Sequence, residues 1–131
     1  MGELNKILHI EDEDDIREIA NMALELIGGF EVAQAGLGTI ALEIVEGFAP
    51  DLLLCDVQMP GLTGPETIEA IRKLPGFETI PAIYMTAKVG ESEKDSLLGQ
   101  YELGFIAKPF DPTTLAMQIR EMWDQGLANA A

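Results

Sequence analysis

Five side chains able to do chemistry follow short apolar stretches that lie far apart along the chain. They are the carboxylates of Glu11, Asp12 and Asp56, the hydroxyl of Thr86 and the ammonium group of Lys108. If the three carboxylates met, they would repel one another, and at least one would have a raised pKa unless a cation lay among them. Mg²⁺ suits such a site, because it takes a few carboxylate or carbonyl oxygens and keeps water and phosphate in its shell.

Asp56 could itself react, because a carboxylate can attack phosphorus and form an acyl phosphate. Such a transfer needs mainly alignment and charge neutralisation, which Mg²⁺, the Lys108 ammonium group and the Thr86 hydroxyl can supply. Each residue also has an ordinary interpretation: Asp56 as a turn or helix-cap residue, Thr86 as an N-cap and Lys108 as a surface lysine. The phosphoryl-transfer hypothesis therefore depends on these side chains coming together.

The same inventory disfavours zinc and calcium. The one cysteine, Cys55, lies in an apolar stretch and is expected to be a small buried hydrophobe. The one histidine, His9, is expected to be a strand residue with a satisfied imidazole rather than a metal ligand or phosphocarrier. Residues 12–16 lack the glycine and the distal glutamate of an EF-hand calcium loop.

The strands and helices that carry these side chains are predicted to form a βα repeat. Short apolar segments at residues 6–10, 30–35, 52–56, 80–85 and 104–107 alternate with segments whose apolar residues recur at helical spacing. Strands joined by helices pair in parallel, with right-handed crossovers. We therefore predict a doubly wound α/β fold with a five-stranded parallel sheet and helices on both faces. Ligands bind beyond the carboxyl ends of such strands, where all five side chains stand.

Apolar spacing also places the helices. The first is predicted from Ile16, Ile19, Ala20, Ala23 and Ile27, and its end from Gly28-Gly29. Pro65 opens the third. A fourth, around residues 91–100, rests on little more than Leu97 and Leu98. The fifth is expected to open with Asp111 as N-cap and Pro112 behind it.

Four motifs in order resemble the receiver domains of two-component response regulators. They are ILHIEDE at residues 7–13, DLLLCDVQMPGLTG at residues 51–64, the pair Thr86-Ala87, and Lys108-Pro109-Phe110. The resemblance covers nearly the whole chain. It implies the flavodoxin-like strand order 2-1-3-4-5 and a single receiver domain over residues 1–131, with a core at about residues 5–125.

The resemblance also implies how the site works. Asp56 would take a phosphoryl group from the phosphohistidine of a histidine kinase or histidine phosphotransfer protein. Asp12, Asp56 and the main-chain carbonyl of Gln58 would hold Mg²⁺, with Glu11 acting mostly through water. The chain would catalyse only its own phosphorylation and dephosphorylation, so we expect a signalling phosphoacceptor rather than an enzyme acting on other substrates.

Output is expected from a switch in which Thr86 moves toward the phosphate and Phe105 turns inward. That movement would remodel the face built from the fourth helix, the fifth strand and the fifth helix, and so change the binding of a downstream protein target. A phosphorylation-dependent homodimer is another form of output that the resemblance allows. Many members of the family have Tyr where Phe105 stands, so an output contact through that hydroxyl is absent here.

Composition limits the partners further. The formal charge of −15 would repel phosphate backbones and anionic lipids, so direct nucleic-acid binding is not expected. No apolar run approaches the roughly 20 residues that span a bilayer, so membrane insertion is not expected either. The first residues lack a signal-peptide pattern, which predicts a cytoplasmic location.

Two alternatives remain open at this point. The run Gly36-Leu37-Gly38-Thr39-Ile40-Ala41 follows a strand and has Asp56 about 20 residues further on, as a dinucleotide fingerprint would, and this would make Asp56 a ribose ligand. That hypothesis ranks second, because the run follows the second strand and leaves Glu11, Thr86 and Lys108 unexplained. The other alternative is a pseudo-receiver that binds partners and never turns over phosphate, which the complete acidic, Thr and Lys set disfavours.

Overall fold

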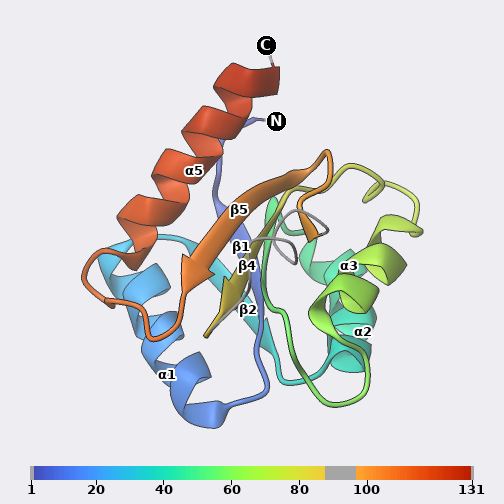
Figure 1. Cartoon of the computed structure of the whole chain (residues 1–131), viewed down its shortest axis with the longest axis horizontal. Coiled ribbons are helices and arrows are strands. Elements are labelled where there is room, and N and C mark those ends of the chain that lie inside the picture. Colours follow the sequence, from blue (N-terminus) through green and yellow to red (C-terminus); the bar gives the residue numbers. More distant parts are fainter. Residues whose placement is uncertain (1, 88–96, 131) are drawn as a thin grey trace.

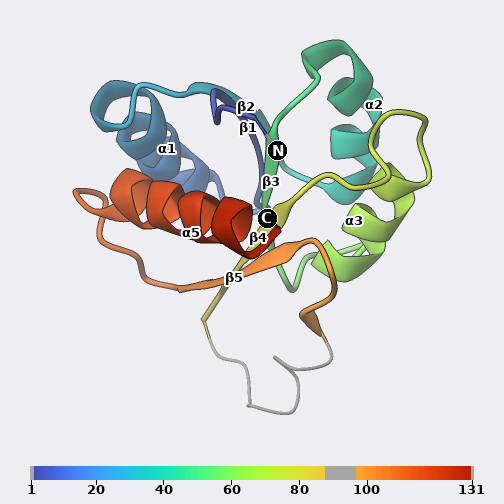
Figure 2. The same cartoon turned by 90° about the horizontal axis from the view of Figure 1, so that it is seen from above.

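The computed structural model describes residues 2–87 and 97–130 of the chain. In that part, five parallel strands form one sheet with the order β2-β1-β3-β4-β5, which confirms the predicted architecture (Figures 1 and 2). The strands are β1 Lys6–Ile10, β2 Glu31–Ala35, β3 Leu52–Asp56, β4 Ala82–Thr86 and β5 Glu102–Ala107. Because all five run the same way, their carboxyl ends lie at one edge of the sheet.

Helices cover both faces of the sheet. In Figure 2, α1 (Asp14–Met22) and α5 (Leu115–Ala130) lie on one side, and α2 (Gly38–Phe48) and α3 (Gly64–Arg72) lie on the other. Alternate strand residues point to opposite faces. The sheet therefore carries two hydrophobic clusters: the first includes Ile7, Leu54 and Leu115, and the second includes Leu8, Cys55 and Ile68. No helix in residues 2–87 or 97–130 is both long and apolar enough to cross a membrane.

The first helix departs from its predicted apolar face. After α1 the chain continues as a π-helix, η1 (Ala23–Ile27), in which the Gly28 amide donates to the Ala23 carbonyl at 3.1 Å. This i→i+5 spacing turns the chain less per residue than an α-helix and rotates the later side chains off the predicted stripe. Ala20 and Ala23 are buried as predicted, but Ile19 is 46% exposed and Ile27 59% exposed. The π-helical turn accounts for Ile27 alone, because Ile19 lies before it in α1, and the predicted single apolar face was wrong at both isoleucines.

Three strands start at other residues than predicted, and β4 also ends one residue later, at Thr86. Strand β2 starts one residue late, because the Phe30 amide donates to the Leu24 carbonyl at 3.0 Å instead of joining the sheet. Strand β4 starts at Ala82 because Pro81 has no amide hydrogen to give to the ladder. Strand β5 starts earlier than predicted, at Glu102, with a register shift beside Ala82 and Ile83.

The remaining helix predictions have mixed outcomes. Thr63 and Glu66, on either side of Pro65, form a capping box, so α3 begins where predicted. Asp111 accepts hydrogen bonds from the Thr113 amide (2.9 Å) and hydroxyl (2.7 Å), which caps a turn, and α5 itself begins only at Leu115. Most of the predicted fourth helix, residues 91–96, lies outside the described residues, so that helix stays a prediction.

Candidate functional site

Asp56 ends the central strand β3, whose five residues are all buried. Its side chain is held from two sides. One carboxylate oxygen, Oδ1, accepts a hydrogen bond from the Gln58 amide at 3.3 Å, and the other, Oδ2, accepts one from Lys108 Nζ at 3.2 Å. The residue is only 7% exposed. A nearly buried, oriented carboxylate at the carboxyl edge of a parallel sheet can act as a nucleophile or as a metal ligand.

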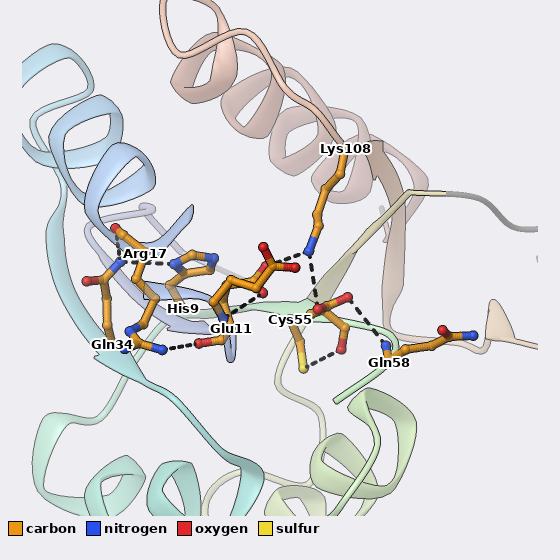
Figure 3. Close-up of polar contacts among 9 residues, drawn as sticks. His9, Glu11, Arg17, Gln34, Cys55, Gln58 and Lys108 are labelled. Atoms are coloured by element: carbon orange, nitrogen blue, oxygen red, sulfur yellow. Dashed lines mark hydrogen bonds and ion pairs between the residues drawn. The ribbon is translucent and has the colours of Figure 1, made fainter. Parts of the chain in front are cut away.

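Lys108 lies just beyond β5 and bridges two strands (Figure 3). Its Nζ donates to Glu11 Oε1 at 2.7 Å as well as to Asp56 Oδ2. Its amide donates to the Thr86 carbonyl at 2.9 Å, which fixes the backbone at the start of this segment. Burial lowers the pKa of Lys108, but the hydrogen bond and charge of Glu11, together with Asp56, outweigh it and raise the pKa above its ordinary value. Lys108 therefore stays an ammonium group.

The third member of the acidic set is Asp12. One carboxylate oxygen each from Glu11, Asp12 and Asp56 lie within 4.8 Å of one another, so the predicted convergence is present. Burial, together with the charge of Asp56, raises the pKa of Glu11 to about 7, although Lys108 acts in the opposite direction. Three clustered carboxylates with one ammonium group leave uncompensated negative charge. An oxygen-rich site with this charge fits Mg²⁺.

Gln58 contacts Asp56 of this cluster, Thr86 contacts Lys108, and Phe105 lies in β5, three residues before Lys108. The Gln58 side chain is exposed, and the contact it makes with Asp56 is through its backbone amide. Thr86 closes β4 and is half-buried, next to the start of the Lys108 segment. Phe105, in β5, is also half-buried and stacks on Tyr84 with ring centroids 5.7 Å apart and an angle of 26° between the rings. The predicted site residues thus come from four strand ends at one edge.

Two further residues near the site, Arg17 and Gln34, were not predicted from the sequence. Arg17 of α1 donates through Nη1 to the Glu11 carbonyl at 2.7 Å. Gln34 of β2 donates through Nε2 to the Arg17 carbonyl at 2.7 Å and makes a 3.0 Å contact with His9 Nδ1. The one available signal was a basic residue within an otherwise acidic segment, six residues after Glu11.

His9 departs from its expected environment. The ring is fully buried, and its Nε2 has no hydrogen-bond partner within the part of the chain that the structure describes. Burial, followed by the charges of Lys108 and Arg17, lowers the pKa of His9 to about 3. The imidazole is therefore neutral, and only one of its nitrogens is satisfied by protein.

The glycines of the 36–41 run have packing roles. A Cβ on Gly38 would lie 2.1 Å from Thr67 Oγ1 of α3, and one on Gly36 would lie 3.0 Å from Arg17 Nη1. The run also follows β2, an edge strand, while Asp56 on β3 pairs with Lys108. Close helix packing accounts for this glycine pattern, and the dinucleotide hypothesis gains no support from the geometry.

Comparison with known proteins shows the family of the chain. The model of the response regulator receiver domain family matches residues 7–120. A 14.6 kDa uncharacterized protein of Leptolyngbya boryana is 35% identical over 88% of this chain and 87% of its own length. Response regulator Rre1 of Synechocystis is 29% identical over 93% of this chain, and transcriptional regulatory protein CseB of Streptomyces avermitilis is 36% identical over 92%.

Solved structures show the same likeness. The chemotaxis protein CheY4 of Vibrio cholerae is 27% identical, with a TM-score of 0.80, over 92% of this chain and 99% of that one. A CheY-like receiver domain protein of Methanospirillum hungatei is 26% identical, also with a TM-score of 0.80, over 97% and 99%.

The chain belongs to the receiver domain family of response regulators, the phosphoacceptor modules of two-component signalling. It spans 53% of the length of Rre1 and 49% of that of CseB. Those two relatives therefore contain sequence that has no counterpart here.

Proposed function

We propose that this chain is a phosphorylation switch in which Asp56 accepts a phosphoryl group with the help of Mg²⁺. The observation that carries the proposal is the position of the Lys108 ammonium group, which donates to both Glu11 and Asp56 beside the third carboxylate, Asp12. A cation held against the nucleophile by a second carboxylate is suited to receive the negative charge of an incoming phosphoryl group.

The proposed donor is the phosphohistidine of a histidine kinase or histidine phosphotransfer protein. A carboxylate oxygen of Asp56 forms a bond to phosphorus while the bond from phosphorus to the imidazole nitrogen breaks, and the nitrogen keeps the electron pair. The product is an acyl phosphate on Asp56. Lys108 then donates to a phosphoryl oxygen in place of the carboxylate oxygen that it contacts now, and the Thr86 hydroxyl donates to another.

Asp12, Asp56 and the main-chain carbonyl of Gln58 are the proposed Mg²⁺ ligands. Glu11 fits a role through water, because its Oε1 already accepts from Lys108 (2.7 Å) and its Oε2 from the Glu13 amide (3.2 Å). A bound Mg²⁺ would neutralise charge on the phosphoryl oxygens. The acidic excess of the site supports this assignment.

The proposed output runs through Thr86 and Phe105 to the face of the predicted fourth helix, β5 and α5. Phe105 already packs on Tyr84, so an inward turn of its ring would disturb the packing between β4 and β5. The partner on this face is a downstream protein target or, alternatively, a second phosphorylated copy of the chain. Direct nucleic-acid binding is not part of the proposal, because the net charge is −15.

The test uses acetyl phosphate and Mg²⁺ with intact-mass spectrometry. We expect one phosphoryl adduct on the wild-type chain, none without Mg²⁺, and none on Asp56→Asn. Asp124→Asn, an exposed residue of α5, is the matched control and should be modified like the wild type. Absence of an adduct on the wild type would refute the proposal and favour a pseudo-receiver. An equal adduct on Asp56→Asn would refute it by showing that another residue is the acceptor.

A further inference from the structure

Arg17 holds the backbone of the acidic turn without touching a carboxylate of the metal cluster. In Figure 3 its guanidinium points toward the Glu11 carbonyl, to which Nη1 donates at 2.7 Å. Nη2 forms an ion pair with Asp14, one turn earlier on α1. The Glu11 amide is held on the other side by the Ala35 carbonyl of β2, at 3.0 Å. Both polar groups of the Glu11 backbone are therefore fixed from outside the turn.

Two residues of the sheet, Gln34 and His9, hold Arg17 in place through hydrogen bonds. The two residues are directly paired in the β1–β2 ladder, and the two hydrogens of Gln34 Nε2 reach His9 Nδ1 (3.0 Å) and the Arg17 carbonyl (2.7 Å). Since Nδ1 accepts this bond, the ring proton of neutral His9 is on Nε2. A continuous series of hydrogen bonds thus links β1, β2 and α1 to the turn that carries Glu11 and Asp12 (Figure 3).

Gly36 provides the space for the guanidinium. A Cβ at this position would lie 3.0 Å from Arg17 Nη1 and 3.5 Å from its Cζ, so a methyl group would push the guanidinium away from the Glu11 carbonyl. Gly36 does not have a positive φ, so its backbone accepts alanine. This glycine belongs to the run that resembled a dinucleotide fingerprint, and here its small size serves the arginine contact.

We infer that Arg17 is a positioning residue for Mg²⁺: it sets the orientation of the Glu11–Asp12 peptide, and so the direction in which the Asp12 carboxylate leaves the backbone. The inference rests on the Mg²⁺ site of the proposed function. Metal affinity depends on groups that orient the ligands, and losing such a group typically weakens binding about 10-fold to 100-fold. Arg17 acts through the turn, since its contacts are with the Glu11 carbonyl and Asp14.

The test measures Mg²⁺ affinity by isothermal titration calorimetry on the unphosphorylated chain. We expect Arg17→Ala to bind Mg²⁺ about 10-fold more weakly than the wild type, and Gly36→Ala, which keeps the arginine but displaces it, to be weakened by a smaller factor. Arg120→Ala is the matched control. Arg120 also donates to a backbone carbonyl, that of Gly28 at 3.0 Å, and its removal changes the net charge equally. Its Mg²⁺ affinity should equal that of the wild type.

Thermal unfolding of the same variants separates positioning from general stability. A merely structural arginine would lower the melting temperature and leave the Mg²⁺ affinity of the folded chain unchanged, which would overturn the inference. If Arg17→Ala does not fold, Gly36→Ala decides: wild-type affinity in that variant would likewise overturn it. Mg²⁺ binding without phosphorylation of the wild type would overturn the proposed function alone, whereas a wild type that binds no Mg²⁺ would overturn both.

Discussion

Lys108 is the residue on which the charge balance of the site depends. Its side chain is 10% exposed, and the two carboxylates that it contacts are 0% and 10% exposed, so all three charges are largely removed from water. Breaking such a buried pair leaves an uncompensated charge and is far more costly than losing a surface ion pair. The ammonium group also lies between Glu11 and Asp56. Its positive charge would repel a Mg²⁺ ion bound by the same carboxylates.

Replacement of Lys108 should therefore separate metal binding from phosphoryl transfer. We predict that Lys108→Ala binds Mg²⁺ at least as tightly as the wild type, because a competing positive charge is gone. Its phosphorylation by acetyl phosphate should be about 100-fold slower, because one group that stabilises the transition state is lost. Calorimetry and initial rates from intact mass measure the two effects. Lys73→Ala, which removes an exposed lysine paired with Glu69, is the control, and loss of Mg²⁺ binding in Lys108→Ala would contradict the prediction.

His9 makes the stability of the fold depend on pH. Because it is the only histidine in the chain, a single imidazole signal reports its protonation state. Its folded-state pKa is about 3 against an ordinary value of 6.5. Between these values the unfolded chain binds a proton that the folded chain does not. The contribution of His9 to stability is thus complete above pH 6.5, and it declines as the pH falls toward 3. Nuclear magnetic resonance of the imidazole should show a neutral ring throughout this window, and titration near 6.5 would contradict this.

At the scale of single elements, helix α2 shows how one residue type can have two opposite roles. Gly38, at its first position, lies against α3 and the loop before it, where a Cβ would meet Thr67 Oγ1 of α3 at 2.1 Å and Leu62 Cβ of the loop at 3.0 Å. Gly47, near the other end of the same helix, has open space around it. The first glycine therefore allows two helices to approach, whereas the second only costs helix stability.

Alanine substitutions at the two glycines should shift stability in opposite directions. We predict that Gly38→Ala destabilises the fold by about 1 to 3 kcal/mol, because an added methyl group over-packs the contact with α3. Gly47→Ala should stabilise it by about 0.5 to 1 kcal/mol, because alanine restricts the unfolded chain and favours the helix. Urea unfolding of both variants measures the difference. Equal effects of the same sign would show that space at Gly38 does not limit the packing of α2 on α3.

At the scale of the whole molecule, one sheet supports both hydrophobic clusters. Strand residues of opposite parity face the two sides, so Leu53 packs in one cluster while its neighbours Leu52 and Leu54 pack in the other. The last helix also contacts the first described residue, because Trp123 Nε1 of α5 donates to the Gly2 carbonyl at 3.1 Å. Neither cluster can lose its packing without exposing the strands that the other also uses.

The shared sheet leads to a prediction about unfolding. Residues 1–131 are predicted to form one domain, with a core at about residues 5–125, and should unfold in a single cooperative transition. Trp123, the only tryptophan, is buried in the first cluster and reports on that side alone, whereas far-ultraviolet circular dichroism reports on all helices and strands. The two signals should give the same urea midpoint. Separate midpoints would indicate two independent units.

The amino-acid sequence alone is enough to predict the repeat of strands and helices and the set of residues at the strand ends. Both follow from local patterns, because buried parallel strands appear as short apolar runs and helices as apolar residues at every third or fourth position. Topological rules for parallel sheets then bring strand ends to one edge, so Asp12, Asp56 and Lys108 could be grouped before any contact was known.

The contacts between those residues could not be predicted without the folded chain. Lys108 contacts Glu11 across 97 residues of sequence and Asp56 across 52, and no local pattern specifies which oxygen receives which hydrogen. The rotation of Ile27 off the buried face depends on a π-helical turn that apolar spacing does not encode. The hydrogen bond from Arg17 to the Glu11 carbonyl depends on the space beside Gly36, which follows strand β2. Such contacts arise from packing between elements, so they become visible only once the whole chain is folded.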